Sequence, residues 1–353
     1  MSFKNYSNEA ITLLLDLIRI PSYSKEEKQA ADHLQNFIES KGVTTARKGN
    51  NVWCVSPGLS LKKPTILLNS HIDTVKPISG WRKRPHEPKS VNDKIFGLGS
   101  NDAGGSLVSL LQLFFLLTSK EQPYNLIFLA SAEEEISGLQ GISSVLPELP
   151  PISFGVVGEP TGMQPAIAER GLMVVDVKIR GKAGHAAREE GDNAIYKALK
   201  SIEWIKNFRF EKKSELLGEV KMTTTQINSG TQHNIVPDLC ELVIDIRSNE
   251  RYSNEEIFET IKSNCEGEVE ARSFRLKPSA TPLDHPFILR AKELGLTPFG
   301  SSTLSDQALM DFPSVKIGPG SSARSHTADE YIKRSEIEEA IERYYLLLND
   351  LSI

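Results

Sequence analysis

The chain has 353 residues, 39% of them hydrophobic and 25% charged, which is the composition of a globular protein with room for a large core and a second domain. The 41 basic and 46 acidic residues give a net charge of -5, and no Lys/Arg-rich stripe stands out, which argues against a nucleic-acid partner. Cys54, Cys240 and Cys265 lack CxxC spacing, so neither a disulfide framework nor a thiolate zinc site is indicated.

The chain shows no segment with the length that a membrane span requires. The longest apolar run, 107–117, is interrupted by Ser109 and Gln112 and is too short to cross a bilayer. The N-terminal residues MSFKNYSNEA are polar and do not resemble a secretory signal. We therefore expect a cytoplasmic protein with no membrane partner.

The first half of the chain alternates helical segments with short apolar strands. ITLLLDLIRI, before Pro21, has the apolar spacing of a helix, and Ser24 followed by Glu27 is typical of a capping box that opens a second helix ending near residue 41. Three apolar strands are predicted at 65–70, 125–131 and 154–157, and a further helix is predicted at 105–120. This alternation predicts an α/β fold, with a buried, mostly parallel sheet and helices on both faces.

From about residue 170 the pattern becomes that of a smaller α+β domain. Apolar and polar residues alternate in PDLCELVIDIR, which is the period of a half-buried strand. With its neighbours this strand predicts the order β-α-β-β-α-β, a split βαβ unit. A strand at 314–318 and a helix from about 335 to 351 then return to the α/β pattern. We therefore predict that 169–277 is inserted into a larger domain made of 1–168 and 278–353.

Histidine and acidic residues follow the ends of the predicted strands, and one further acidic residue, Asp102, lies in the Gly-rich turn GLGSNDAGGS. The residues are His71, Asp73, Asp102, Glu133, Glu134, Glu135, Glu159 and His326. Each has an ordinary explanation by itself, as a loop histidine, a helix-capping aspartate or a solvated acidic run. Because the carboxyl ends of parallel strands meet at the edge where ligands of α/β folds bind, the whole set indicates one site.

The residue types indicate a metal site. Imidazole nitrogens and carboxylate oxygens suit Zn²⁺ or another first-row divalent ion, and adjacent carboxylates require a cation or a proton between them. A dinucleotide-binding loop is disfavoured, because its third glycine would stand where the chain has Asp102. Two metals that share a carboxylate would make a bridging water acidic enough to attack an amide.

In chain order, the segments SHID, GSND, AEEE, GEPT and SHTADE resemble the motifs of the M20 family of metallopeptidases and deacylases. The resemblance covers almost the whole chain and implies a zinc exopeptidase-like catalytic domain that binds two Zn²⁺ ions, for which Co²⁺ can substitute. It implies that His71 and Glu159 bind one metal, that Glu135 and His326 bind the other, and that Asp102 bridges them.

The same resemblance implies further roles in catalysis. Glu134 would be the general base, with Glu133 as the alternative, and Asp73 would orient His71. The inserted domain would be a ferredoxin-like lid and dimerisation domain. The segments around His185 and Asn234 match the substrate-facing segments of the family, which in relatives reach the site of a partner subunit.

Arg247 lies on the polar face of its predicted strand, where it fits the family's grip on a substrate carboxylate, although a surface salt bridge is an equal explanation. We expect a homodimeric hydrolase that removes an acetyl or succinyl group from N-acyl-ornithine or N-acyl-citrulline in arginine biosynthesis. The alternatives are a succinyl-diaminopimelate desuccinylase, a metal-dependent aminopeptidase or dipeptidase, and a binding protein without activity.

Overall fold

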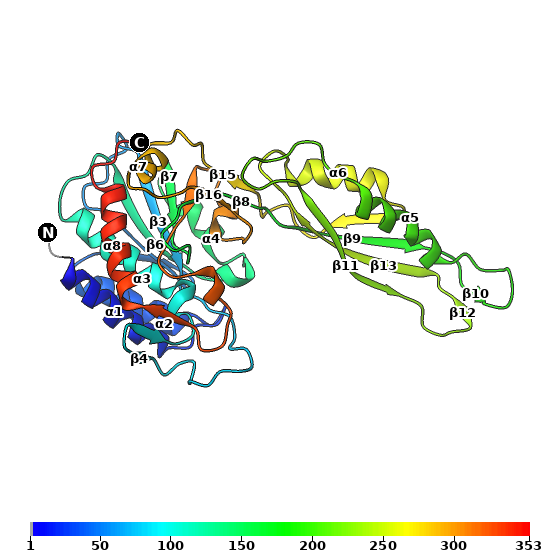
Figure 1. Ribbon diagram of the computed structural model, residues 1–353, viewed down its shortest axis with the longest axis horizontal. Helices are drawn as coiled ribbons and strands as arrows, with labels where there is room; N and C mark the ends of the chain where they lie inside the picture. The colour runs from blue at the N-terminus through cyan, green and yellow to red at the C-terminus, as the bar shows by residue number, and fades with distance from the viewer. Residues whose placement is uncertain (1–2) are drawn as a thin grey trace. The chain divides into compact units, whose positions relative to one another are not determined.

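The computed structural model describes residues 3–353. The chain divides into two compact units (Figure 1). The first unit comprises Met1–Ile167, Thr281–Phe299 and Ser305–Ile353, and the second comprises Ala168–Ala280 and Gly300–Leu304. None of the helices within 3–353 is long and apolar enough to cross a membrane.

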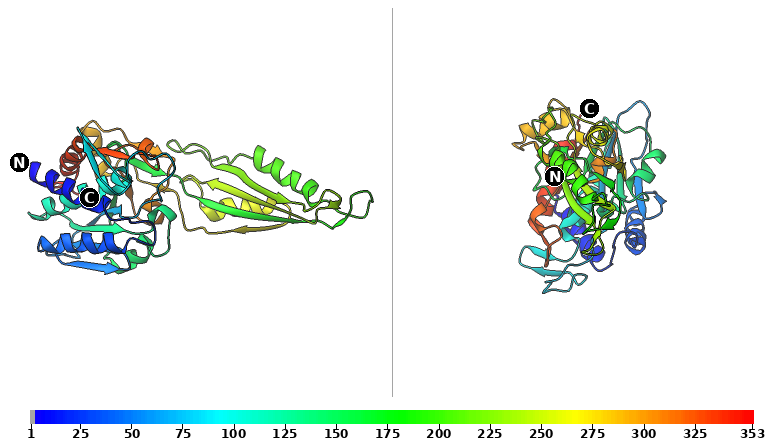
Figure 2. Two further views of the ribbon diagram at one scale, coloured as in Figure 1. Left: turned by 90° about the horizontal axis from the view of Figure 1, so that it is seen from below. Right: turned by 90° about the vertical axis from the view of Figure 1, so that its right-hand side faces the viewer.

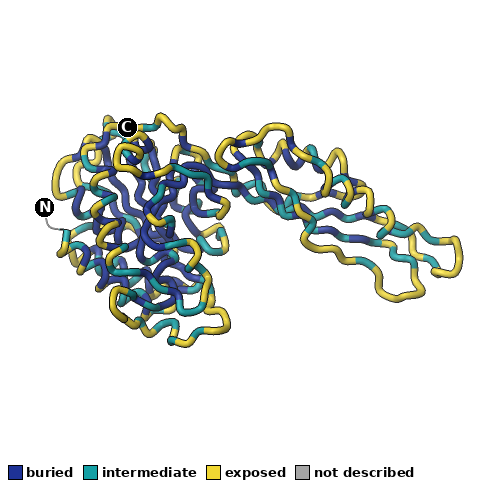
Figure 3. Tube along the Cα trace, in the orientation of Figure 1, coloured by how far each residue is buried: buried dark blue, intermediate teal, exposed yellow. Residues whose placement is uncertain are grey.

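A mixed sheet forms the centre of the first unit. Its four central strands run parallel, in the order β6 (Asn125–Ser131), β3 (Thr65–His71), β7 (Phe154–Val157) and β17 (Ser314–Lys316). These strands are buried along their whole length (Figure 3), and apolar side chains predominate in β6 and β7, as expected of strands covered on both faces. The predicted parallel sheet is therefore confirmed at its centre.

Short strands outside the predicted set extend this sheet at both edges. Antiparallel strands β2 (Asn51–Val55) and β1 (Thr45–Lys48) lie beyond β6, and β8 (Ala166–Glu169), where the chain passes into the second unit, pairs antiparallel with β17. β15 (Ser279–Ala280) pairs antiparallel with β8, and β16 (Phe299–Ser301) pairs with β8 as well. A separate antiparallel sheet consists of β18 (Tyr331–Lys333), β5 (Lys94–Phe96) and β4 (Lys89–Val91). Strands of three to five residues carry too little alternation to be recognised from sequence.

Helices cover both faces of the central sheet, as predicted. The larger core packs against α1 (Lys4–Ile18), α2 (Lys28–Ser40), α3 (Gly105–Thr118), α7 (Pro286–Glu293) and α8 (Arg334–Leu348). The opposite face packs against α4 (Ile142–Val145) and the residues around the short helices η3 (Leu146–Glu148) and η4 (Asp306–Leu309). From opposite ends of the chain, α1 and α8 lie side by side (Figure 2). The ring centroids of Phe3 and Tyr345 are 5.5 Å apart.

The predicted capping box at the start of α2 is wrong. The helix begins at Lys28, and its N-cap residue Glu27 makes no side-chain cap. The Ser24 hydroxyl donates instead to Oδ2 of Asp73 at 2.7 Å, and Glu27 accepts from the backbone N–H of Lys25 at 2.7 Å. Ser24 therefore bonds to a partner 49 residues away instead of a local one, because the buried Asp73 lies beside it in the interior of the first unit.

The second unit is a four-stranded antiparallel sheet with two helices on one side. Its strands follow the order β11 (Lys221–Ser229), β13 (Leu239–Arg247), β9 (Met173–Arg180) and β14 (Glu268–Ala271). The inward residues of β13, Cys240, Leu242, Ile244 and Ile246, are buried as predicted and share a core with α5 (Ala194–Asn207) and α6 (Asn254–Asn264). The order β-α-β-β-α-β is thus confirmed, with a short ribbon of β10 (Gly184–His185) and β12 (Ile235–Val236) added.

Candidate metal centre

The predicted metal ligands of the first unit meet where the carboxyl ends of the parallel strands meet. His71 is the last residue of β3, and Glu159 follows the end of β7 by two residues. Glu134 and Glu135 open the short helix η2 (Glu134–Ile136) just after β6. Because β3 pairs with both β6 and β7 in parallel, all of these side chains start at the same edge of the sheet.

Asp102 lies between two histidines that come from distant parts of the chain. Its Oδ1 is 3.3 Å from Nε2 of His71, and its Oδ2 is 3.6 Å from Nε2 of His326. Nε2 of His71 is also 3.6 Å from Oε1 of Glu159, and Nε2 of His326 is 2.9 Å from Oε2 of Glu135. The contacts therefore form two sets of side chains that have Asp102 in common.

Asp73 ties the loop after β3 to the turn after β6. Nδ1 of His71 lies 2.9 Å from the backbone carbonyl oxygen of Asp73, so a proton on Nδ1 leaves Nε2 free to act as a ligand. The buried Asp73 carboxylate accepts from the backbone N–H groups of Glu134 at 3.0 Å and Glu135 at 3.1 Å. Asp73 thus positions Glu134 and Glu135 through its carboxylate and His71 through its backbone carbonyl.

The electrostatics of the cluster call for a cation. Burial, and then the charges of neighbouring carboxylates, raise the pKa of Glu134 well above its usual range, and burial raises the pKa of Glu159 to about 8. The hydrogen bond with Glu135 raises the pKa of His326 to about 9. Burial alone would lower the pKa of His71, but the hydrogen bonds with Asp102 and Asp73 outweigh it and raise that pKa. Without a metal, these groups retain protons that balance the acidic charge.

Glu133 and Glu134 differ in where their side chains go. Glu133 has a left-handed backbone conformation with a φ of 55°, and its Oε2 accepts from the backbone N–H of Gln140 at 3.3 Å. Ligand atoms of His71, Glu134 and Glu159 all lie within 4.8 Å of one another. Glu134 therefore belongs to the histidine cluster, and Glu133 faces the loop that follows it.

Two supporting residues were missed from the sequence. Glu330 is 2% exposed, and its carboxylate accepts from the backbone N–H groups of Gly99, Asn101 and Asp102 at 3.1, 2.7 and 3.0 Å, which holds the turn η1 (Ser100–Gly104) in place. Ser24, which donates to Asp73, is the second. Glu330 lies in the SHTADE segment, four residues after His326, and this closeness in sequence is the one signal that pointed to it.

The remaining predicted site residues, His185, Asn234 and Arg247, belong to the second unit. His185 and Asn234 are exposed and lie on adjoining segments, since the Ala186 N–H donates to the Asn234 carbonyl at 3.0 Å. Arg247 is bound by Asp245 through two hydrogen bonds of 2.8 and 3.1 Å. The salt-bridge explanation for Arg247 therefore describes its state in this structure.

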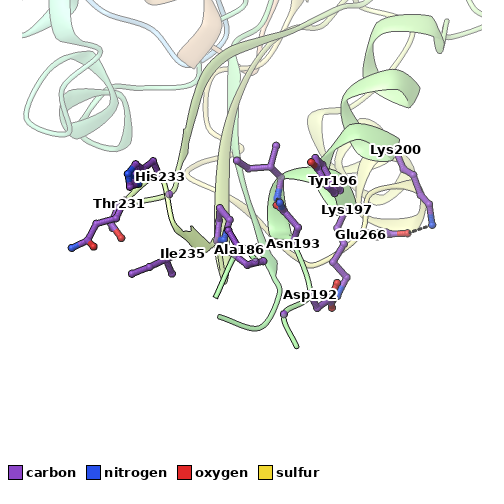
Figure 4. A pocket seen from close by; sticks show the side chains of 16 residues that line it. Ala186, Asp192, Asn193, Tyr196, Lys197, Lys200, Thr231, His233, Ile235 and Glu266 are labelled. Carbon is purple, nitrogen blue, oxygen red and sulfur yellow. Dashed lines mark hydrogen bonds and ion pairs between the residues drawn. The ribbon is translucent and has the colours of Figure 1, made fainter. Parts of the chain in front are cut away.

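A groove of about 1050 Å³ adjoins His185 and Asn234 within the second unit (Figure 4). It is lined from α5 by Tyr196 and from the other side by His233 and Ile235. The cationic groups that line it are paired, because Lys197 contacts Asp192 at 2.6 Å and Lys200 contacts Glu266 at 3.1 Å. The groove therefore offers a mainly polar surface with an aromatic side chain from α5, and both of its lysines are paired with carboxylates.

The donor set of the first unit fits divalent metal ions. Every candidate ligand supplies an imidazole nitrogen or a carboxylate oxygen, and ligand atoms of His71, Asp102 and Glu135 also lie within 4.8 Å of one another. The carboxylates outnumber the histidines, so that a positive ion would relieve repulsion that protons relieve in its absence. These residues can hold a metal centre.

Comparison with known proteins agrees with this chemistry. Residues 67–350 match the model of peptidase family M20/M25/M40. Acetylornithine deacetylase of Proteus mirabilis is 28% identical over 93% of both chains, and succinyl-diaminopimelate desuccinylase of Corynebacterium glutamicum is 28% identical over 96% of both chains.

Solved structures share the fold. An aminopeptidase of Bacillus cereus superimposes with a TM-score of 0.79 at 21% identity and covers 98% of both chains. A Bacillus subtilis protein described as a dinuclear metal binding peptidase from the M20 family superimposes with a TM-score of 0.73 at 18% identity, again over 98% of both chains. With the family match extending over most of its length, the chain belongs to peptidase family M20/M25/M40 and is a hydrolase of amide bonds.

Proposed function

We propose that this hydrolase uses two metal ions to remove an acetyl or succinyl group from a small N-acyl amino acid, with N-acyl-ornithine or N-acyl-citrulline as the first candidates. The observation that carries the proposal is the position of Asp102 between His71 and His326, with a further carboxylate on each histidine. Relatives of similar length include an acetylornithine deacetylase and a succinyl-diaminopimelate desuccinylase, which supports small acylated amino acids as substrates.

In this proposal the contacts divide the ligands between two ions. His71 and Glu159 would hold one ion, Glu135 and His326 would hold the other, and Asp102, which contacts both histidines, would serve both ions. Zn²⁺ is the candidate metal, and Co²⁺ can replace it because both accept nitrogen and oxygen ligands. When bound, such ions polarise the acyl carbonyl and acidify a water molecule.

Glu134 is the proposed general base. Its carboxyl lies in the cluster but is not needed as a ligand in the division above. As a carboxylate it can accept a proton from the attacking water and return it to the departing amine. The Asp73 carboxylate holds Glu134 in place by accepting a hydrogen bond from the backbone N–H of Glu134.

The second unit supplies substrate contacts and a dimer interface in this proposal. His185 and Asn234 are exposed donors that can bind a developing oxyanion, and Arg247 can grip a substrate carboxylate once it exchanges its bond with Asp245. A homodimer is supported by exposed Tyr196 and Leu199 on α5 (71% and 56% exposed). Sedimentation of the full chain tests it, and a monomer at micromolar concentration would refute it.

A cytoplasmic location completes the proposal. The thiols of Cys54, Cys240 and Cys265 are all unpaired and buried, which suits a reducing compartment. Cell fractionation with an antibody against the chain tests this, and recovery of the protein outside the cytoplasm would contradict it.

A substrate panel at saturating Zn²⁺ or Co²⁺ tests the reaction. N-acetyl-ornithine, N-succinyl-ornithine, N-acetyl-citrulline and N-succinyl-diaminopimelate are compared with a set of dipeptides, and released amine is measured. We expect hydrolysis of an N-acyl amino acid with a kcat/KM at least tenfold above that of any dipeptide. A preference for dipeptides would favour the second candidate, an aminopeptidase or dipeptidase, which the structural likeness to the Bacillus cereus enzyme supports.

Adjacent carboxylates provide a matched test of the base. Glu134→Gln should lower kcat by roughly 10²–10⁴-fold with both metals retained, because a general base contributes about that much. Glu133→Gln is the control, since its carboxylate is bound to the Gln140 backbone and should matter far less to turnover. Full activity of Glu134→Gln with loss of activity in Glu133→Gln would transfer the role to Glu133.

A further inference from the structure

A buried carboxylate that has no part in the proposed reaction lies beneath the metal centre. Asp306 is the first residue of η4 and is 3% exposed. Its Oδ2 accepts a hydrogen bond from Nδ2 of Asn69 at 2.8 Å and another from Oγ of Ser131 at 2.6 Å. Both donors are neutral and fully buried, so neither neutralises the carboxylate.

The two donors place Asp306 directly below His71. Side chains alternate along a strand, so Asn69 projects from the same face of β3 as His71. Ser131 ends β6 and pairs in register with His71, and its carbonyl accepts from the backbone N–H of Ile72 at 2.8 Å. Asp306 therefore connects the end of β3, which carries the predicted ligand His71, with the end of β6, which leads to Glu134.

Below this polar layer the same face of the sheet is apolar. Leu67 and Leu129, two residues before Asn69 and Ser131, pack in one cluster with Met310 from the end of η4. An ionised carboxylate at the boundary of such a core is costly unless a positive charge lies near. Burial raises the pKa of Asp306 to about 6, and the two hydrogen bonds and the charge of His71 oppose that rise.

We propose that Asp306 is a positioning residue of the metal centre, which fixes the ends of β3 and β6 and supplies negative charge that favours a divalent ion at His71. The proposal rests on the metal-dependent function proposed above. Asp306 acts through Asn69 and Ser131 and is not itself a ligand. Outer residues of this kind typically contribute about 10–100-fold to metal affinity or activity.

Metal binding by the full chain tests this role apart from turnover. Asp306→Asn keeps the side-chain volume and one acceptor oxygen but removes the charge, whereas Asp306→Ala removes the hydrogen bonds as well. Thr281→Ala is the matched control, because the Thr281 side chain is also buried in the first unit and makes two hydrogen bonds. Both bonds are with the backbone of Ser314, which begins β17 and therefore lies at the sheet edge away from the metal centre. Co²⁺ affinity by calorimetry, the visible Co²⁺ spectrum and the melting temperature of the metal-free chain are measured at pH 7.5.

We expect Asp306→Asn to bind Co²⁺ about tenfold more weakly with a nearly unchanged metal-free melting temperature, and Asp306→Ala to bind it about 10–100-fold more weakly with an altered spectrum. Thr281→Ala should melt earlier with wild-type affinity. Wild-type Co²⁺ isotherms and spectra in both Asp306 variants would overturn the proposal, and the Asn variant decides if the Ala variant does not fold.

The two proposals fail in different ways. If the wild-type chain binds Co²⁺ and the Asp306 variants bind it more weakly, but no N-acyl amino acid is hydrolysed, the proposed substrate class is wrong and the positioning role stands. If hydrolysis occurs and the variants match the wild type in metal binding, the positioning role is wrong and the reaction stands. A double-mutant cycle of Asp306→Ala with Ser131→Ala should show coupling in Co²⁺ affinity, because these two substitutions break the same hydrogen bond.

Discussion

Removing the metals should make the stability of the protein fall as the pH rises from 6 to 8. Burial raises the pKa of Glu159 to about 8 in the folded metal-free chain, against a usual value of 4.5. Between these two values the folded chain holds a proton that the unfolded chain has released, so the free energy of unfolding decreases with pH. The raised pKa of His326, about 9 against 6.5, has the same sign: its stabilising contribution is complete below 6.5 and is lost as the pH rises through 9.

The size of the effect follows from the number of protons retained. Each proton held only by the folded chain changes the free energy of unfolding by about 1.4 kcal/mol per pH unit. The side chain of Glu159 is 13% exposed, so this group alone accounts for about 2 kcal/mol between pH 6 and pH 8, because half of its proton is already lost at pH 8. His326 is 52% exposed and adds less because solvent screens its charge. A change of about 2 kcal/mol corresponds to roughly 4–8 °C in melting temperature for a unit of this size.

Calorimetric melting of chelator-treated and Zn²⁺-loaded protein at pH 6, 7 and 8 measures this difference. The metal-free melting temperature should fall across the series, and the stabilisation by metal should grow, because ligands must lose their protons to bind. Glu159→Gln is the control, since its neutral amide cannot release a proton and should flatten the slope by about one proton. A metal-free melting temperature that stays constant or rises from pH 6 to pH 8 would refute the reasoning.

Three substitutions test the supporting contacts. Glu330→Gln should leave a backbone N–H of the Asp102 turn without its acceptor and cost about 1–3 kcal/mol in denaturant unfolding, and an unchanged midpoint would contradict that role. Ser24→Ala should weaken metal binding about tenfold by freeing Asp73, as measured by calorimetry; equal affinity would show that the Ser24 bond is dispensable. Arg247→Lys should raise KM about tenfold with little change in kcat, because lysine cannot grip a carboxylate bidentately, and unchanged kinetics would remove Arg247 from the substrate site.

The positions of the candidate ligands could be predicted because they depend on a regular feature of the chain. Of three apolar strands, one ends at His71 and the other two are followed within a few residues by the Glu134–Glu135 pair and by Glu159. Parallel pairing brings the ends of these strands to one edge of the sheet. The alternation in β13 likewise predicted its buried face. Periodicity describes which residues share a face, and that information was sufficient for the centre of each sheet.

Hydrogen-bond partners were less accessible to sequence reasoning. Ser24 and Glu27 have the spacing of a capping box, yet Ser24 bonds to Asp73, 49 residues away, because the tertiary fold buries a stronger acceptor beside it. Glu330 and Asp306 bind backbone and side-chain groups 175 to 237 residues distant. Such partners are chosen by packing, and no local pattern records them. The short edge strands escaped for a related reason, since their pairing is set by the neighbours already in the sheet.

The different positions of the three adjacent glutamates depend on backbone geometry, which the sequence does not reveal. Their side chains are chemically identical, so composition cannot assign a base. The left-handed conformation of Glu133, with a φ of 55°, turns the chain directly before η2, and Asp73 then receives the N–H groups of the next two residues. Glu133 consequently bonds to the Gln140 loop, whereas Glu134 and Glu135 face the histidines. The different roles proposed for these identical residues therefore follow from the backbone turn at Glu133 and from the Asp73 carboxylate that holds the next two residues.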